Sequence, residues 1–257
     1  LLPRIASTLD GQVGRLLERL LARQGLDLRV KTKLVRAEKS GEKVRLSLDT
    51  GDGREEEAEF DRVLVAVGRK PLVRGLGLEE LGINRNPAGF VMVDEDYRTN
   101  LPGVYAIGDL IPGPMLAHKA SAEGTAAVER LAGLPSEVDY DSIASVVYTS
   151  PEAASVGKSE QELKELGVDY KSAVYPFTGA GRAQCQGETA GFVKILASSN
   201  SGRLLGVHII GPHASELIAE CVLAVKSHVS ARELAQTVHA HPTLSEAVRE
   251  TAAILAK

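Results

Sequence analysis

The sequence predicts an α/β protein whose first part combines buried strands with helices, and whose second part is an antiparallel sheet with helices on one face. Two apolar runs, Val63–Val67 and Val104–Ile107, each end at a glycine and have the composition of fully buried strands. After Pro135 the strand-like segments follow one another without helical crossovers, which favours antiparallel pairing. The 257 residues are 44% hydrophobic and 25% charged, as is typical of a folded globular chain.

The first predicted element is a helix. Ser7–Asp10 has the form of a capping box, and the apolar residues after it keep helical spacing up to Gly25. Alternation of apolar and polar residues then predicts three strands, over Leu26–Val30, Val44–Leu48 and Phe60–Val67.

The remaining elements follow the second buried run. A helix is expected from Ala117 to Leu131, and another from Ser215 to Lys226, whose apolar residues predict an extensive contact face. We place the main boundary near residues 137–142. The strands after it are expected over Ser145–Val147, Tyr170–Tyr175, Phe192–Leu196 and Leu204–Ile210.

Charge and cysteine content exclude several classes of function. The net charge is -4 with both signs interspersed, so we expect no nucleic-acid partner. No apolar run reaches the roughly 18–20 residues of a membrane span, and no cleavable leader pattern is present, so we expect no membrane partner. Cys185 and Cys221 have neither metal-ligand nor C-x-x-C spacing, so we expect neither a metal site nor redox chemistry from these cysteines.

Gly108 and Asp109 follow the second buried run, at the strand end where ligands gather in open α/β sheets. A carboxylate there can accept hydrogen bonds from ligand hydroxyls, although the same pair is also common in turns and helix caps. The next stretch, Met115 to His118, leads into a helix whose amino terminus favours electron-rich groups. The alternative is a helix begun after proline, with His118 on the surface.

The strongest pattern is the segment from His239 to Glu246. Pro242 favours extended backbone at His241, and Thr243 is placed to cap a helix whose third residue is Glu246. A carboxylate that orients a histidine is the usual arrangement of a general base. Two alternatives stay open: Glu246 only completes a capping box, or His239 and His241 bind a metal, for which no nearby cluster supplies further ligands.

A glycine-rich dinucleotide turn is absent, because Gly179-Ala180-Gly181 and Gly75-Leu76-Gly77 lack the third glycine. Five other segments match a known family in order: Leu2-Pro3-Arg4, Val67 to Pro71, Tyr105 to Asp109, Met115 to Lys119, and His239 to Glu246. With these segments the chain resembles the pyridine-nucleotide disulfide oxidoreductase family, and within it the dihydrolipoyl dehydrogenase branch.

The resemblance implies a division of the chain and two cofactors. Residues 1–70 would end a Rossmann-like NAD-binding domain, 71–139 would return to an FAD-binding domain, and 140–257 would form an α+β dimerisation domain. The FAD contacts would come from Gly108, Asp109 and Met115, Leu116, Ala117 and His118, and the NAD contacts from Leu34 and Gly68.

The resemblance also implies a reaction and partners. His241 would be the acid-base group that serves dihydrolipoamide oxidation, oriented by Glu246, and the redox disulfide would lie in an amino-terminal half outside this sequence. A homodimer is implied, with the lipoyl and peripheral subunit-binding domains of a 2-oxo acid dehydrogenase complex as partners, in a bacterial cytoplasm or a mitochondrial matrix. Another disulfide reductase of the family, or a non-catalytic dimerisation or docking module, remains the alternative.

Overall fold

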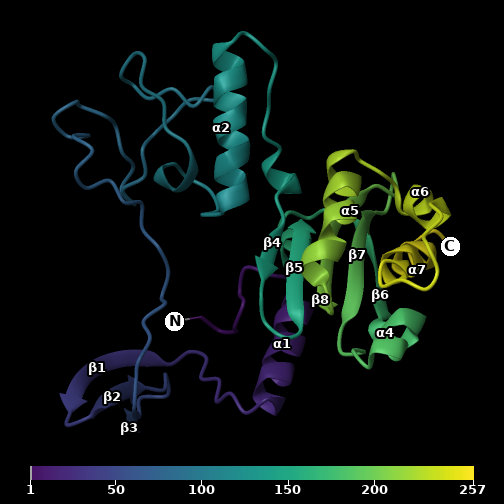
Figure 1. Cartoon of the computed structure of the whole chain (residues 1–257), viewed down its shortest axis with the longest axis horizontal. Coiled ribbons are helices and arrows are strands. Elements are labelled where there is room, and N and C mark those ends of the chain that lie inside the picture. Colours follow the sequence, from purple (N-terminus) through teal and green to yellow (C-terminus); the bar gives the residue numbers. More distant parts are fainter. Residues whose placement is uncertain (1) are drawn as a thin grey trace. The chain divides into compact units, whose positions relative to one another are not determined.

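The computed structural model describes residues 2–257, which divide into two compact units. One unit joins the chain up to Val63 with Asp141–Lys257, and the other is Leu64–Tyr140. Both sheets of the described residues belong to the first unit, whereas the long helix α2 belongs to the second (Figure 1).

A five-stranded sheet forms the centre of the first unit, with strand order β4-β5-β8-β7-β6. Every neighbouring pair in it is antiparallel, which confirms the sheet predicted for the second part of the chain. Four of its strands were predicted, but β5 was not, because its sequence is short and rich in small residues. The bounds are β4 (Ser145–Val147), β5 (Glu152–Gly157), β6 (Tyr170–Pro176), β7 (Phe192–Ser198) and β8 (Leu204–Gly211).

Helices cover one face of this sheet. Side chains alternate between the two faces of a strand, so Val207 and Ile209 of β8 point into this helical layer. The expected helix over Ser215–Lys226 is confirmed as α5, and most of its apolar residues pack onto the sheet, whereas Leu223 stays 65% exposed. The helices whose buried residues belong to this core are α4 (Gly181–Gln186), α5 (Ala214–Lys226), α6 (Ala231–Gln236) and α7 (Glu246–Leu255).

The opposite face of the sheet is covered by α1 (Gly11–Arg23). Val13 and Leu17 of α1 pack with Phe192 and Ile210 of the sheet. The capping box expected to begin at Ser7 is wrong. Instead, Asp10 is the N-cap, and its side chain accepts the Gln12 N–H at 2.9 Å, because a carboxylate directly before the first turn reaches those donors best.

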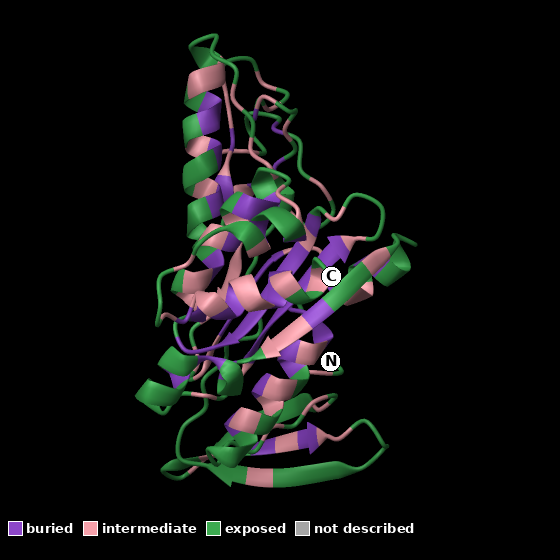
Figure 2. Cartoon of the chain, turned by 90° about the vertical axis from the view of Figure 1, so that its right-hand side faces the viewer, coloured by how far each residue is buried: buried purple, intermediate pink, exposed green. Residues whose placement is uncertain are grey.

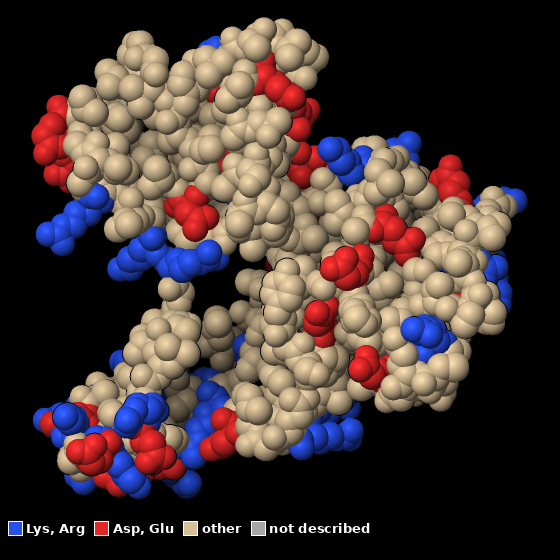
Figure 3. Space-filling model, in the orientation of Figure 1, with Lys and Arg blue, Asp and Glu red and all other residues tan. Residues whose placement is uncertain are grey.

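A smaller antiparallel sheet comprises β1 (Lys33–Ser40), β2 (Lys43–Asp49) and β3 (Glu55–Phe60). The strand predicted over Val44–Leu48 is therefore confirmed as part of β2. Figure 2 shows the five-stranded sheet as largely buried, whereas β1 and β3 are mostly exposed. Both charge signs cover the small sheet in Figure 3. In this sheet the side chains of Arg36 and Glu38 form an ion pair at 2.6 Å.

Three strand predictions are wrong in this structure. Leu26–Val30 and Val104–Ile107 contain no strand, and neither does the stretch beyond Phe60. Within Val63–Val67, expected as a buried central strand, Leu64 is 91% exposed and Val67 is 92% exposed. A strand forms only where a neighbour completes its hydrogen-bond ladder, and the described residues place no strand beside this run.

The second unit contains the predicted helix as α2 (Ala117–Leu131) and the short 3-10 helix η1 (Gly108–Leu110). Its core is small and includes Ile83, Val91 and Ala126. Among the residues that the structure describes, no helix is long and apolar enough to cross a membrane.

Candidate functional site

His241 lies in the loop before α7, and its side chain contacts Glu246, the first residue of that helix. The His241 Nδ1 lies 2.9 Å from Oε1 of Glu246, and the other carboxylate oxygen accepts the Thr243 backbone N–H at 2.8 Å. The His241 side chain is 77% exposed, whereas that of Glu246 is 24% exposed. The inner carboxylate therefore fixes a ring that is open to a ligand.

The hydrogen bonds of this pair determine its protonation. The Thr243 N–H, followed by His241, lowers the pKa of Glu246, so the carboxylate is ionised at neutral pH. An ionised carboxylate only accepts, so Nδ1 of His241 carries a proton in this contact, and in the neutral ring Nε2 presents a lone pair. A ring held in this tautomer is suited to take a proton from a bound acid.

The second candidate site lies in the unit Leu64–Tyr140, where Arg69 connects two of the predicted FAD residues. Its Nη1 is 3.6 Å from Oδ2 of Asp109, and its Nη2 donates to the carbonyl of Met115. The Asp109 side chain is 48% exposed, so its oxygens have room to accept further hydrogen bonds.

Gly108, beside Asp109, is fixed by a buried ion pair. Its φ is +69°, and a Cβ there would lie 3.0 Å from the Cβ of Ala120, so both the conformation and the space require glycine. The Gly108 N–H donates to Oε2 of Glu123 at 2.7 Å, and its carbonyl accepts from Nζ of Lys119 at 3.0 Å. Lys119 and Glu123 are 3.2 Å apart with fully buried side chains, and the Tyr140 hydroxyl donates to Glu123 at 2.8 Å.

The amino terminus of α2 begins directly after Met115. Leu116 is the N-cap, and no side chain caps the helix. Ala117 and His118 in its first turn are exposed. Uncapped N–H groups and the helix dipole attract an electron-rich group, so this end of α2 and Asp109 together suit a ligand with acceptor atoms and hydroxyls.

The two predicted NAD residues lie in different units. Leu34 is in β1 and is 45% exposed. Gly68 lies in the extended segment of the other unit with φ +118°, a backbone conformation that favours glycine.

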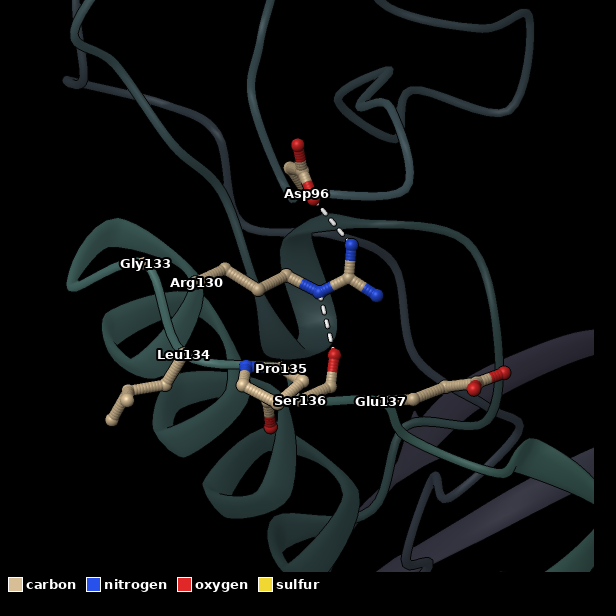
Figure 4. Close-up of a pocket in the computed structure, with 7 residues that line it drawn as sticks. All are labelled: Asp96, Arg130, Gly133, Leu134, Pro135, Ser136 and Glu137. Carbon is tan, nitrogen blue, oxygen red and sulfur yellow. Dashed lines mark hydrogen bonds and ion pairs between the residues drawn. The ribbon is translucent and has the colours of Figure 1, made fainter.

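The cysteines and the described cavities add no further catalytic group. Cys185 is exposed, Cys221 is buried, and burial raises the pKa of the Cys221 thiol. Within residues 2–257, no group of three or more His, Cys, Asp or Glu side chains could hold a metal ion. Figure 4 shows a hollow in which Asp96 neutralises Arg130, and no predicted site residue lines it.

Sequence reasoning missed the residues that support these sites. Lys119 and Glu123 have the i, i+4 spacing of a helical ion pair, which could have indicated their contact but not its burial. The sequence indicated His239 only as an alternative metal ligand, whereas its Nε2 lies 3.1 Å from Oε2 of Glu220 in α5. That contact joins residues nineteen positions apart and has no local pattern.

The chain has an α/β fold with a histidine oriented by a carboxylate in one unit and, in the other, an uncapped helix amino terminus near an exposed aspartate. Two family models match it: the pyridine nucleotide-disulphide oxidoreductase model over residues 1–124 and the dimerisation domain of the same family over residues 143–252. The chain belongs to the pyridine nucleotide-disulphide oxidoreductase family.

Its relatives include a mitochondrial dihydrolipoyl dehydrogenase of Pisum sativum and a leghemoglobin reductase of Glycine max, each 45% identical over 96% of this chain. The alignments cover 50% and 48% of those proteins, so the chain spans about half the length of the curated relatives it matches. The crystal structure of LpdA from Mycobacterium tuberculosis superposes with a TM-score of 0.88 at 30% identity, over 96% of this chain and 53% of that one.

Proposed function

We propose that the complete protein is a dihydrolipoyl dehydrogenase, which oxidises protein-bound dihydrolipoamide with NAD through FAD and a redox disulfide. The observation that supports this proposal is the His241–Glu246 pair, in which Nδ1 lies 2.9 Å from the carboxylate and the His241 side chain is 77% exposed. The names of the curated relatives support the choice of substrate. Because Cys221 is buried and Cys185 stands apart from it, the redox disulfide is assigned to a part of the protein outside this sequence.

The site of the second unit is assigned to FAD, whose chemistry when bound is to carry an electron pair between the disulfide and NAD. Asp109 would accept a hydrogen bond from a hydroxyl of the ribityl chain. Gly108, which has no Cβ, would let the turn pack closely against Ala120. Met115, Leu116, Ala117 and His118 would supply the contacts of the α2 terminus to the ring system. Gly68 and Leu34 are assigned to NAD.

In the proposed reaction, Nε2 of His241 takes the proton of a dihydrolipoyl thiol. The resulting thiolate attacks one sulfur of the redox disulfide, forming a new S–S bond while the old one breaks. The second thiol then closes the lipoyl ring and releases the enzyme dithiol, so the two electrons pass from the substrate to the disulfide. Ionised Glu246 keeps the ring in the required tautomer and stabilises its protonated form.

The proposal includes the organisation of the whole protein. Residues 1–70 are assigned to the NAD-binding domain, 71–139 to the FAD-binding domain and 140–257 to the dimerisation domain of a homodimer. Its protein partners would be the lipoyl domain and the peripheral subunit-binding domain of a 2-oxo acid dehydrogenase complex. The protein would be located in a mitochondrial matrix or a bacterial cytoplasm. Several relatives are named as mitochondrial.

The test is His241→Gln in the complete protein. Loss of a positioned acid-base group should lower dihydrolipoamide oxidation by roughly 10²–10⁴-fold. Electron transfer from NADH to an artificial acceptor needs no thiol deprotonation and should largely survive. His228→Gln, which changes an exposed histidine after α5, should leave both reactions unchanged. Equal loss of both activities in His241→Gln would overturn the assignment of the base.

A further inference from the structure

His239 is an inward-facing side chain of the loop between α6 and α7. In this loop Val238 is 94% exposed, and the side chain of His241 is 77% exposed. The His239 side chain, between them, is only 6% exposed. The ring of His239 therefore attaches the loop to its unit on the amino-terminal side of His241, and the buried Leu244 attaches it on the other side.

Both nitrogens of this ring have oxygen neighbours. Nδ1 lies 3.0 Å from the carbonyl of Thr237, the C-cap of α6, and Nε2 lies 3.1 Å from Oε2 of Glu220 in α5. The ring thus connects the end of one helix to the side of another. The second Glu220 oxygen is buried and has no hydrogen-bond partner among the described residues, so His239 is the group that compensates this carboxyl.

The geometry also determines where the protons are. A carbonyl only accepts, so the contact with Thr237 is a hydrogen bond only when Nδ1 carries a proton. Nε2 then forms a hydrogen bond with Glu220 only if one further proton is present, either on Nε2 or on the carboxyl. Burial raises the pKa of Glu220, and the charge of His239 opposes that shift, which is consistent with a retained proton.

We propose that His239 is a positioning residue: its ring, protonated at Nδ1 and held between Thr237 and Glu220, anchors to α5 the loop that carries His241. The inference rests on the proposed function in that His241 is taken as the base. The residue itself touches no substrate in this role. It acts by fixing where the exposed His241 ring stands.

The activity test separates anchoring from charge. In the complete protein, His239→Ala and Glu220→Ala should each lower kcat for dihydrolipoamide by about tenfold, because a base displaced by about 1 Å loses catalytic efficiency. Glu220→Gln should keep activity within about twofold, since its amide N–H can donate to Nε2 while Nδ1–H still bonds Thr237. NADH oxidation by an artificial acceptor should not change in any variant.

Glu216→Ala is the matched control, because it removes an exposed carboxylate from the same helix. The anchor would be overturned if kcat in Glu220→Ala were the same as in Glu216→Ala. It would also be overturned if Glu220→Gln lost as much activity as Glu220→Ala. A complete protein without dihydrolipoamide oxidation would instead overturn the proposed function.

The anchor has a test that needs no activity. Long-range ¹⁵N–¹H spectra of the imidazoles in the 257-residue chain should show His239 protonated at Nδ1. In Glu220→Gln the same ring should be neutral and still carry the proton on Nδ1. A His239 ring with a bare Nδ1 and a proton on Nε2 would overturn the inference, because Thr237 would then face a lone pair.

Discussion

Glu246 performs two functions that the sequence presents as alternatives. One oxygen accepts the Thr243 backbone N–H, as a capping residue does, and the other accepts the proton of His241. The expected position is slightly wrong: Ser245 is the N-cap and Glu246 is the first helical residue, not the third. Because a carboxylate has two accepting oxygens, capping and orientation do not compete.

Glu246→Gln should therefore impair both functions moderately. An amide has one accepting oxygen and one donating NH₂, so either one of the two contacts is lost, or the NH₂ donates to Nδ1 of His241 and the ring takes the tautomer whose Nε2 carries the proton. We expect a rate loss of about tenfold, smaller than for His241→Gln, and a stability loss of about 1 kcal/mol. Parallel measurement of kcat/KM and denaturant unfolding tests this, and a change in only one of the two would mean that the carboxylate has a single function.

The amino termini of two helices converge on one buried lysine. Nζ of Lys194 in β7 is 3.0 Å from Asp10, the N-cap of α1, and 2.6 Å from Glu160, the first residue of α3 (Glu160–Glu165). Asp10 also accepts the Glu160 backbone N–H at 3.1 Å. The side chains of Lys194 and Asp10 are 1% and 0% exposed, so each charge depends on the other for compensation.

This cluster predicts a loss of stability in acid. The hydrogen bond from Lys194 is the main cause that lowers the pKa of Glu160 from 4.5 to about 2. Because the folded pKa lies below the unfolded one, the stabilisation is complete above about pH 4.5 and disappears as the pH falls towards 2. At 1.36 kcal/mol per pKa unit, the difference between 4.5 and about 2 corresponds to about 3 kcal/mol, so Glu160→Gln should cost about that much at pH 7.

Denaturant unfolding at pH 7 and pH 3 measures this difference, which should shrink at pH 3. Glu165→Gln, an exposed carboxylate of the same helix, is the control and should have little effect at either pH. A pH-independent cost of Glu160→Gln would show that packing, and not charge, is responsible.

For the whole molecule, the apolar surface that remains exposed on α5 indicates self-association. Most apolar residues of α5 pack onto the sheet, but Leu223 is 65% exposed, in a region that matches a dimerisation-domain model. Large exposed apolar groups near a family interface commonly become buried on assembly.

We therefore expect the chain to sediment as a dimer at micromolar concentration, and Leu223→Lys to shift it towards monomer because a charge would be buried without a partner. Leu166→Lys changes a leucine that is 64% exposed after α3, and it should leave the dimer intact. A monomer in the unsubstituted chain, or dissociation by both substitutions, would contradict this interface.

Elements that depend on local pattern could be predicted from the amino-acid sequence. The helix over Ala117–Leu131 and four strands of the five-stranded sheet follow from periodicity and turn residues, which act over a few positions. The His241–Glu246 pair could also be predicted, because its members are five residues apart across one helix start.

Which of these segments find hydrogen-bond partners and become buried depends on contacts between distant parts of the chain. The composition of Val63–Val67 predicts a buried strand. In the structure this run is exposed, because the described chain supplies no adjacent strand for its hydrogen bonds. Lysine side chains are usually exposed. Lys194 is buried, because Asp10, at the start of α1 and far away in the sequence, lies over the sheet and pairs with this lysine. Burial and hydrogen-bond partners are set by contacts between distant segments, which local sequence does not encode.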